Sequence, residues 1–401
     1  MLRLSFLDRT RGLIMIFMAL DHALYFWSNG RVNNEGLPLL VNGTLTFHPL
    51  GSTTLLGLLV MFLSSLCAPG FLFIAGYVLA LSIKKREATG ASDLSIDKYL
   101  WKRGLVLIAL QLLIASPAFN LPLFIQAKSF STATIGTFFS LSVLSSIGLG
   151  FIVLSFGRRI SPWKLLGVTG FLYLLSQAYL PKFTMDFPLL QTLVKACQTV
   201  LVLPVPFSPE LLVNNNFPLI PWLLPMTLGW LYGQTYTEKR GVSYEANRFA
   251  VSGLCSIALF LVLRSAGIGD YLLPDGTMQG FWGLSKYPPS IDYFLLYLGL
   301  VFLLFFLFFK LSDTSKIGGL LENFGRAPLF FYNAHLWLYA AIPAVLGHFN
   351  ALSLLPGTGI WLLGILILYP LTQSYQILRS SHKLRNPRSK LLPRSESISS
   401  L

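Results

Sequence analysis

The residues best suited to chemistry lie on one apolar segment near the N-terminus, LDRTRGLIMIFMALDHALYFW (7–27). Arg11 and His22 are eleven positions apart, which on an α-helix is about 20° beyond three full turns, so both lie on one face. The helical rise separates them by about 16 Å. A guanidinium pairs with anions and an imidazole exchanges protons near neutral pH. This face therefore predicts a polar pathway into a helix bundle, while Asp21 points about 100° away from His22.

Each of these residues also has a structural interpretation. Arg11 is placed where an arginine anchors a helix at the membrane interface, with its charged end reaching water. His22 is also compatible with a packing residue that is hydrogen-bonded to a neighbouring helix. The shared face favours the pathway but leaves open what would move along it.

A second polar group lies on the segment ENFGRAPLFFYNAHLWLYA (322–340). Pro328 follows Gly325 and Arg326 and predicts a helix start, because proline is well suited to the first helical turn. Asn333 and His335 then fall within the membrane-spanning part, where polar groups are costly. We take both as site candidates, with polar contacts between helices as the structural alternative.

Three outer segments supply further candidates. Trp222 lies in NNNFPLIPWLLPMTLGW (214–230), and Lys286 and Tyr287 lie in LSKYPPSIDYFLLYLG (284–299). Proline and aromatic residues at span entrances are typical of the interfacial belt, but Lys286 is one of few basic residues expected outside. His48 is expected in the first outer loop, near the outer end of the His22 segment.

Composition and hydrophobic pattern predict the elements that position these residues. Hydrophobic residues make up 54% of the 401 residues and charged residues 11%, whereas soluble domains carry about 25% charged residues. The pattern predicts an all-α, polytopic transmembrane bundle of about ten helices. The expected spans are 11–28, 54–82, 100–119, 135–156, 163–181, 217–235, 249–265, 291–309, 327–346 and 357–377.

The net charge of +14 is explained by orientation and does not indicate nucleic-acid binding, because basic residues collect in cytoplasmic loops. Ten spans with both termini cytoplasmic place 24 of the 30 basic residues inside. The six outer ones are Arg31, Lys128, Lys182, Lys195, Arg264 and Lys286. We expect one transmembrane domain (1–378), a basic, disordered cytoplasmic tail (379–401) and an inner-membrane location. The apolar stretch 188–206 is interpreted as re-entrant, since a further span would reverse everything after it.

The sequence gives no sign of other common sites. The three cysteines have no paired spacing, so no disulfide framework or metal site is expected. No Gly-rich nucleotide motif and no GxSxG elbow is present.

Several stretches together resemble the bacterial relatives of heparan-α-glucosaminide N-acetyltransferase, a branch of the transmembrane acyltransferases. They are LDRTRGLIMIFMALDH, CAPGFLFIAGYVLALS, YLWKRGLVLIALQ, PLIPWLLPMTLGWLYG, KYPPSIDYFLLYLG and FGRAPLFFYNAHLWLY, which run from residue 7 to about residue 340. The spacing of Arg11 and His22 also resembles the first helix of the wider acyltransferase type 3 group.

The resemblance implies that a cytoplasmic acyl-CoA, typically acetyl-CoA, gives its acyl group to a hydroxyl or amine of an extracytoplasmic sugar or glycolipid. No permanently bound cofactor is implied. On this basis Arg11 and Arg326 are expected to bind the donor, and His22, His335 and His48 are the catalytic candidates. Asp21, Trp222, Lys286, Tyr287 and Asn333 are expected to bind the substrate.

The resemblance leaves two alternatives open at the catalytic position. His22 would act as a general base or would take the acyl group itself. In the lysosomal member of the family the histidine discussed as catalytic lies beyond the first helix, which makes His48 a rival to His22.

Other function classes also remain open. A transporter or flippase would use the polar face without covalent chemistry, and a non-catalytic scaffold would leave the polar groups unexplained. The expected partners are the bilayer, the acyl donor and an envelope glycan or glycolipid acceptor. A homodimer with a second copy of the chain is compatible with the sequence.

Overall fold

A computed structural model of the chain describes residues 4–29, 37–41, 44–48, 54–126, 139–179, 197, 201–205, 208–237, 241–311 and 315–385. Helices dominate it. They are α1 (Ser5–Trp27), α2 (Leu55–Ser65), α3 (Cys67–Ala88), α4 (Asp93–Leu110), η1 (Gln111–Ala115), α5 (Ser116–Gln126), α7 (Val143–Gly157), α8 (Pro162–Tyr179), α10 (Leu219–Thr235), α11 (Gly241–Ser265), α12 (Met278–Trp282), α13 (Ile291–Lys310), α14 (Lys316–Gly325), α15 (Pro328–Leu346) and α16 (Leu354–Arg385).

Each of the ten expected spans contains at least one helix. The span 100–119 comprises α4, η1 and part of α5, and the span 135–156 holds strand β3 (Ser140–Leu141) before α7. Within the described residues, six helical stretches are long and apolar enough to cross a membrane: Leu55–Ala88, Asp93–Pro122, Ser243–Ser265, Ile291–Lys310, Pro328–Leu346 and Leu354–Ser381. The mostly helical class and the membrane character are therefore confirmed. The number of ten spans and the side of each terminus stay predictions.

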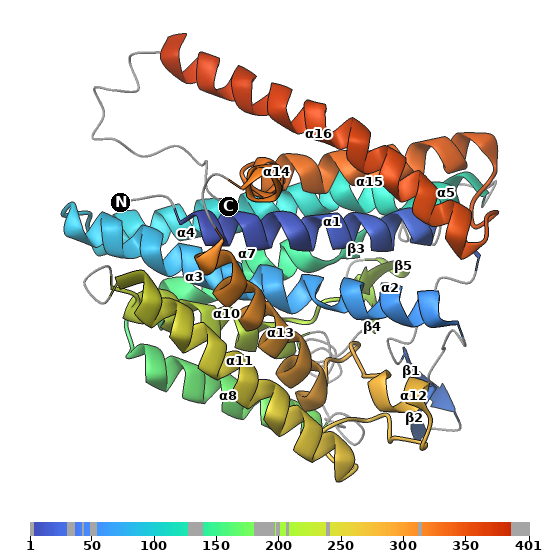
Figure 1. Ribbon diagram of the computed structural model, residues 1–401, viewed down its shortest axis with the longest axis horizontal. Coiled ribbons are helices and arrows are strands. Elements are labelled where there is room, and N and C mark those ends of the chain that lie inside the picture. The colour runs from blue at the N-terminus through green and yellow to red at the C-terminus, as the bar shows by residue number, and fades with distance from the viewer. Residues whose placement is uncertain are drawn as a thin grey trace.

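Helix α1 lies in the middle of the bundle. It contacts α2, α3, α13, α14, α15 and α16, and Figure 1 shows it running between α15 and α3. The last helix, α16, crosses the bundle and then diverges from it (Figure 1). It remains helical through Arg385, so the first residues of the expected tail are helical, and 386–401 lie outside the described residues.

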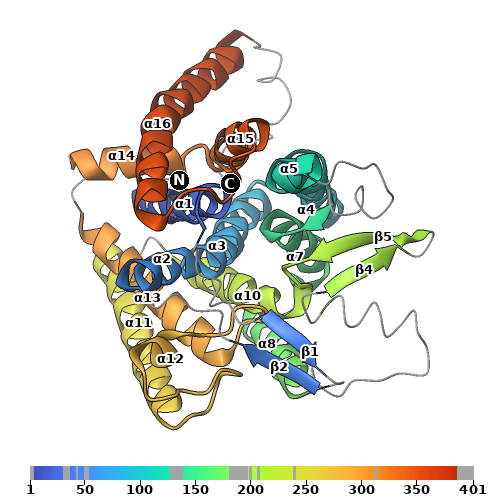
Figure 2. The same ribbon diagram turned by 90° about the vertical axis from the view of Figure 1, so that its right-hand side faces the viewer.

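Two small sheets were not predicted. Strands β1 (Leu37–Val41) and β2 (Thr44–His48) form an antiparallel hairpin. Strand β5 (Ser208–Asn215) pairs antiparallel with β4 (Leu201–Val205) and parallel with β3 (Ser140–Leu141). Figure 2, which views the bundle along its helices, shows β4 and β5 projecting beside α4, α5 and α7. Most of the segment 188–206, expected to be re-entrant, lies outside the described residues.

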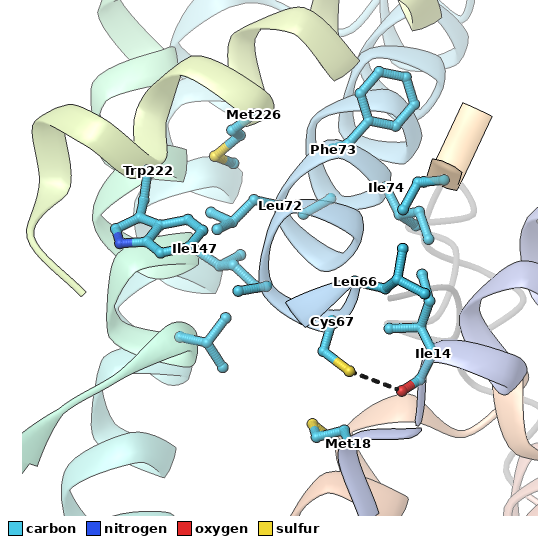
Figure 3. Packing of buried hydrophobic residues seen from close by; sticks show 14 of the residues in the cluster. Ile14, Met18, Leu66, Cys67, Leu72, Phe73, Ile74, Ile147, Trp222 and Met226 are labelled. Carbon is cyan, nitrogen blue, oxygen red and sulfur yellow. Dashed lines mark hydrogen bonds between the residues drawn. The ribbon is translucent and has the colours of Figure 1, made fainter. Parts of the chain in front are cut away.

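Helices α3 and α10 pack closely because glycines meet backbone at their contact. A Cβ atom on Gly76 would lie 1.9 Å from the Met226 carbonyl oxygen, and one on Gly229 would lie 2.0 Å from that of Phe73. Figure 3 shows part of this interface, with Trp222 and Met226 of α10 on the side of α3 where Leu72 lies, and with the Phe73 ring pointing away from them. This contact fixes α3, which lines both cavities described below.

We expect Gly76→Ala to lower the thermal midpoint of the purified protein by several degrees, because overpacking costs about 1–3 kcal/mol. The matched control is Gly167→Ala in α8, where an added Cβ has no neighbour within 4 Å. The measurement is thermal unfolding in detergent. Equal midpoints for the two variants would contradict the close α3–α10 contact.

Candidate active site

His22 of α1 and His335 of α15 form a hydrogen-bonded pair. Nδ1 of His22 lies 2.8 Å from Nε2 of His335, and the rings are stacked with centroids 5.1 Å apart. Nδ1 of His335 lies 2.8 Å from the carbonyl oxygen of Phe331. A carbonyl only accepts, so Nδ1 of His335 donates and its Nε2 accepts from His22. In the neutral pair, Nε2 is then the ring nitrogen of His22 that carries no proton.

His22 lines an outer cavity that is open at one side and contains about 780 Å³ of empty space, solvent at its mouth included. His335 is fully buried and is not among the residues that line it. Its wall combines apolar side chains with a set of polar residues, called the polar wall: Asp21, His22, Ser64, Gln111, Ser140, Ser142, Asn216 and Lys286. The cavity can therefore hold a hydroxyl-rich or amine-bearing molecule against the imidazole.

A second, apolar cavity continues from the outer one towards the start of α1. The two share Met18, Phe71, Val143 and Tyr332. Arg11 lines the inner cavity, and its other lining residues are Met15, Ile74, Ala75, Leu107, Leu144, Ile147, Pro328 and Leu329. Arg11 and His22 thus face two neighbouring cavities that share part of their walls, as their shared helix face predicts.

The start of α1 is tied to the neighbouring helices by two buried arginines. Arg11 donates from NH1 to the Gly325 carbonyl oxygen (3.0 Å) and contacts Asp8 (3.4 Å). Arg9 pairs with Glu322 through Nε (3.0 Å) and donates to the Leu311 carbonyl oxygen (2.7 Å). Compensation of this kind is required, because an unpaired charge in such a place is costly.

Lys286 and Tyr287 reach the outer cavity from the loop between α11 and α13. Lys286 is 5% exposed, and its ammonium lies 5.1 Å from the ring centroid of Tyr287. The Tyr287 ring in turn packs edge-on against Phe217 at 5.6 Å. This loop therefore places a cation and a phenol in the wall of the cavity that contains His22.

Asp270 holds this loop in place. It accepts hydrogen bonds from the backbone N–H of Leu272 (2.8 Å) and Ser285 (3.2 Å) and from the Ser290 hydroxyl. Burial raises the pKa of Asp270 to about 6, although the hydrogen bonds and the guanidinium of Arg264 lower it. Asp270 therefore gains a proton in mildly acidic solution.

The model of the family described as heparan-alpha-glucosaminide N-acetyltransferase, catalytic, matches residues 43–265, which is more than half of the chain. The chain belongs to this family. Membership indicates a membrane protein of acetyltransferase-like function. A search of curated proteins finds no match.

The family match covers His48 and the polar wall residues from Ser64 to Asn216. It does not cover Asp21, His22, Lys286 or His335. His48 ends strand β2, and its side chain lies outside the described residues, so its distance from the cavity is not defined. The structure thus brings together Arg11, Asp21, His22, Lys286 and Tyr287 around the two cavities, with His335 behind His22.

Three predicted residues lie elsewhere in the described structure. Trp222 is fully buried and packs edge-on against Tyr293 and Phe294. Asn333 donates to the carbonyl oxygen of Leu329 at 2.8 Å, and Arg326 pairs with Glu322. None of the three lines either cavity. These residues would therefore affect substrate binding only through other residues.

Sequence analysis did not assign a role to Gln111, which begins the π-helical turn η1. Its Nε2 donates to the Ser140 carbonyl oxygen (3.2 Å), while its Oε1 is buried and has no hydrogen-bond partner within the described chain. Single π turns are frequent at functional sites. The only sequence signal was an amide inside an expected span, which also fits ordinary polar contacts between helices.

We expect the free energy of unfolding to fall as pH rises from about 4 to about 6. Asp270 has a folded-state pKa near 6 and an ordinary value of 3.8, so the folded state binds more protons in this window, at about 1.4 kcal/mol per pKa unit. Asp270→Asn should remove this contribution. The measurement is thermal unfolding against pH.

The matched control is Asp275→Asn in the same loop. Hydrogen bonds from Thr277 lower the pKa of Asp275, so this substitution should leave the decline between pH 4 and 6 in place. An unchanged decline in Asp270→Asn would show that another group causes it.

Proposed function

We propose that this protein transfers an acyl group from cytoplasmic acyl-CoA to a hydroxyl or amine of an extracytoplasmic sugar or glycolipid, with His22 acting on the acceptor. The observation that carries the proposal is the hydrogen-bonded chain from the Phe331 carbonyl through His335 to His22. This chain of hydrogen bonds ends at the imidazole of His22, which lines the outer cavity. The inner cavity lies next to the outer one and shares part of its wall. Family membership supports the acetyltransferase class.

The hydrogen-bonded chain suits proton transfer at His22. The backbone carbonyl fixes the tautomer of His335, and His335 fixes that of His22, so Nε2 of His22 is the basic nitrogen. Orientation of a catalytic imidazole by a second group is the arrangement that general base and nucleophilic catalysis both use. His335 then acts as a positioning residue and does not touch the substrate.

The two cavities suit the two substrates. The inner cavity is smaller, about 560 Å³ against about 780 Å³, and its lining is almost entirely apolar apart from Arg11. This fits an extended thiol-bearing arm whose anionic end lies beyond the arginine. The outer cavity combines apolar residues with hydroxyl, amide and charged groups, which fits a sugar. A thioester that reaches the shared residues Met18, Phe71, Val143 and Tyr332 would meet the acceptor beside His22.

Two routes satisfy the atom balance. In direct transfer, Nε2 of His22 removes the acceptor proton while the acceptor oxygen or nitrogen attacks the thioester carbonyl, and the thiolate of CoA leaves. In the covalent route, Nε2 attacks the thioester carbonyl first, the N–C bond forms and the thiolate of CoA leaves. The acceptor then attacks the acyl-imidazole carbonyl, the N–C bond breaks, and the acceptor proton passes to the released imidazole and on to the thiolate. Both routes need the same unprotonated nitrogen.

We expect His22→Ala to lower kcat for acyl transfer by about 10²–10⁴-fold, the usual contribution of a general base. His335→Ala should lower kcat less and leave the KM for the donor unchanged, because it only orients His22. The measurement is transfer of labelled acetyl from acetyl-CoA to envelope lipids by purified protein in vesicles.

The control is His348→Ala, which removes an exposed imidazole near the end of α15. Full activity in His22→Ala with a folded protein would refute the role of His22 and leave His48 as the candidate. Passage of substrate without covalent transfer in the wild type would favour the transporter alternative.

Arg11→Ala should raise the KM for acyl-CoA more than it lowers kcat, because the guanidinium lies at the donor end of the inner cavity, far from the reacting atoms. Initial rates at varied donor concentration measure this. A loss confined to kcat would count against donor binding at Arg11.

A further inference from the structure

A cationic and aromatic cluster lies between α3 and α4, outside the site described above. The guanidinium of Arg86 lies 3.6 Å from the ring centroid of Tyr99, and that of Arg103 lies 5.2 Å from it. Arg103 also donates to the Tyr99 hydroxyl, which is within 3.4 Å of the Ser82 hydroxyl. One tyrosine thus holds two arginines close together, all three half-buried.

This cluster lies on the continuation of the path formed by the two cavities. Along α3, Cys67 and Ala68 line the outer cavity, Phe71 lines both, and Ile74 and Ala75 line the inner one. Arg86 is eleven positions beyond Ala75, so it lies within about 20° of the same face and about 16 Å further along.

Helix α4 carries its cavity-lining residues in the same spatial order as α3, but its chain runs in the opposite direction. Gln111, in the π turn that follows α4, lines the outer cavity, and Leu107 lines the inner one. Arg103 precedes Leu107 by four residues, which places it about 40° around the helix and about 6 Å further along. Both helices therefore carry an arginine beyond the inner cavity, on the side away from His22.

The charges of the two arginines are not neutralised by carboxylates of the described chain. The acidic groups nearby are engaged by a different arginine: Arg158 pairs with Glu87 (3.7 Å), Asp93 (2.7 Å) and Asp97 (3.1 Å). Neither Arg86 nor Arg103 forms an ion pair within that part of the chain, and the buried Nε of Arg86 has no hydrogen-bond partner there.

We propose that Arg86 and Arg103, held by Tyr99, bind the phosphate groups at the nucleotide end of the acyl donor. Guanidinium groups are suited to bidentate recognition of phosphate. Arg86 and Arg103 have no carboxylate partner within the described chain, and they lie in line with the inner cavity. This arrangement matches a donor whose thiol arm passes Arg11. This inference rests on the proposed function, since it takes acyl-CoA to be the donor.

The test compares two donors in detergent-purified protein: acetyl-CoA, and S-acetylpantetheine, which has the same thioester and arm but no nucleotide. Arg86→Gln and Arg103→Gln should each raise the KM for acetyl-CoA roughly tenfold, the loss expected for one charge-assisted hydrogen-bonding group. The KM for S-acetylpantetheine should not change. The control is Lys102→Gln, which removes an exposed cation beside Arg103 and should alter neither KM.

Unchanged KM values for both donors, or equal increases for both, would overturn the nucleotide site while leaving the acyltransferase function intact. Loss of stabilisation by phosphatidylglycerol vesicles with unchanged KM values would assign the arginines to a lipid phosphate and would also overturn it. If the glutamine variants do not fold, Arg86→Lys and Arg103→Lys keep the charge and should raise the KM for acetyl-CoA alone by a smaller factor.

Failure of the proposed function is distinguished by binding of adenosine 3′,5′-bisphosphate, measured by calorimetry without any acceptor. Binding to wild type that weakens roughly tenfold in either glutamine variant supports the site even if no acyl transfer is found. No binding to wild type overturns the site, whatever the transfer assay shows.

Discussion

The start of α1 carries two guanidinium groups into the most enclosed part of the bundle, and the surrounding structure compensates for this charge. An uncompensated buried charge costs several kcal/mol. Arg9 is neutralised by Glu322 and Arg11 is held by the Gly325 carbonyl, so α14 must lie against α1 where it does. The position of α14 sets the start of α15, because only Arg326 and Ala327 separate the two helices. The placement of His335 beside His22 thus depends on how these charges are paired.

The same helix orders the polar groups along one line. Arg11 faces the inner cavity and His22 the outer one, while α3 and α4 carry their lining residues in matching order. The apolar inner cavity separates Arg11 from the imidazole of His22. The outer cavity adds the charged groups of Asp21 and Lys286 beside that imidazole. Polar residues from outside α1, which include Gln111 and Asn216, complete the wall of the outer cavity.

Much of this arrangement was predictable because membrane spans have a strong hydrophobic pattern, and each of the ten expected spans contains a helix. The shared face of Arg11 and His22 followed from helical periodicity alone. The pairing of His22 with His335 did not, because periodicity within one helix says nothing about which helix packs against it. For the same reason, the sequence pattern placed Trp222 in the interfacial belt of the membrane, whereas in the structure its side chain lies in the buried core. The small sheets in the loops were not predicted.

The hydrogen bond between His22 and His335 joins residues 313 positions apart in the chain. Chains are synthesised from the N-terminus, and early segments can insert and pack before later ones exist. The inner cavity is lined mainly by α1, α3, α4 and α7, so most of its wall is present while α15 is still on the ribosome. The imidazole of His22 lacks its orienting partner during that interval. Competence for proton transfer is therefore acquired late in biogenesis, after most of the donor chamber is in place.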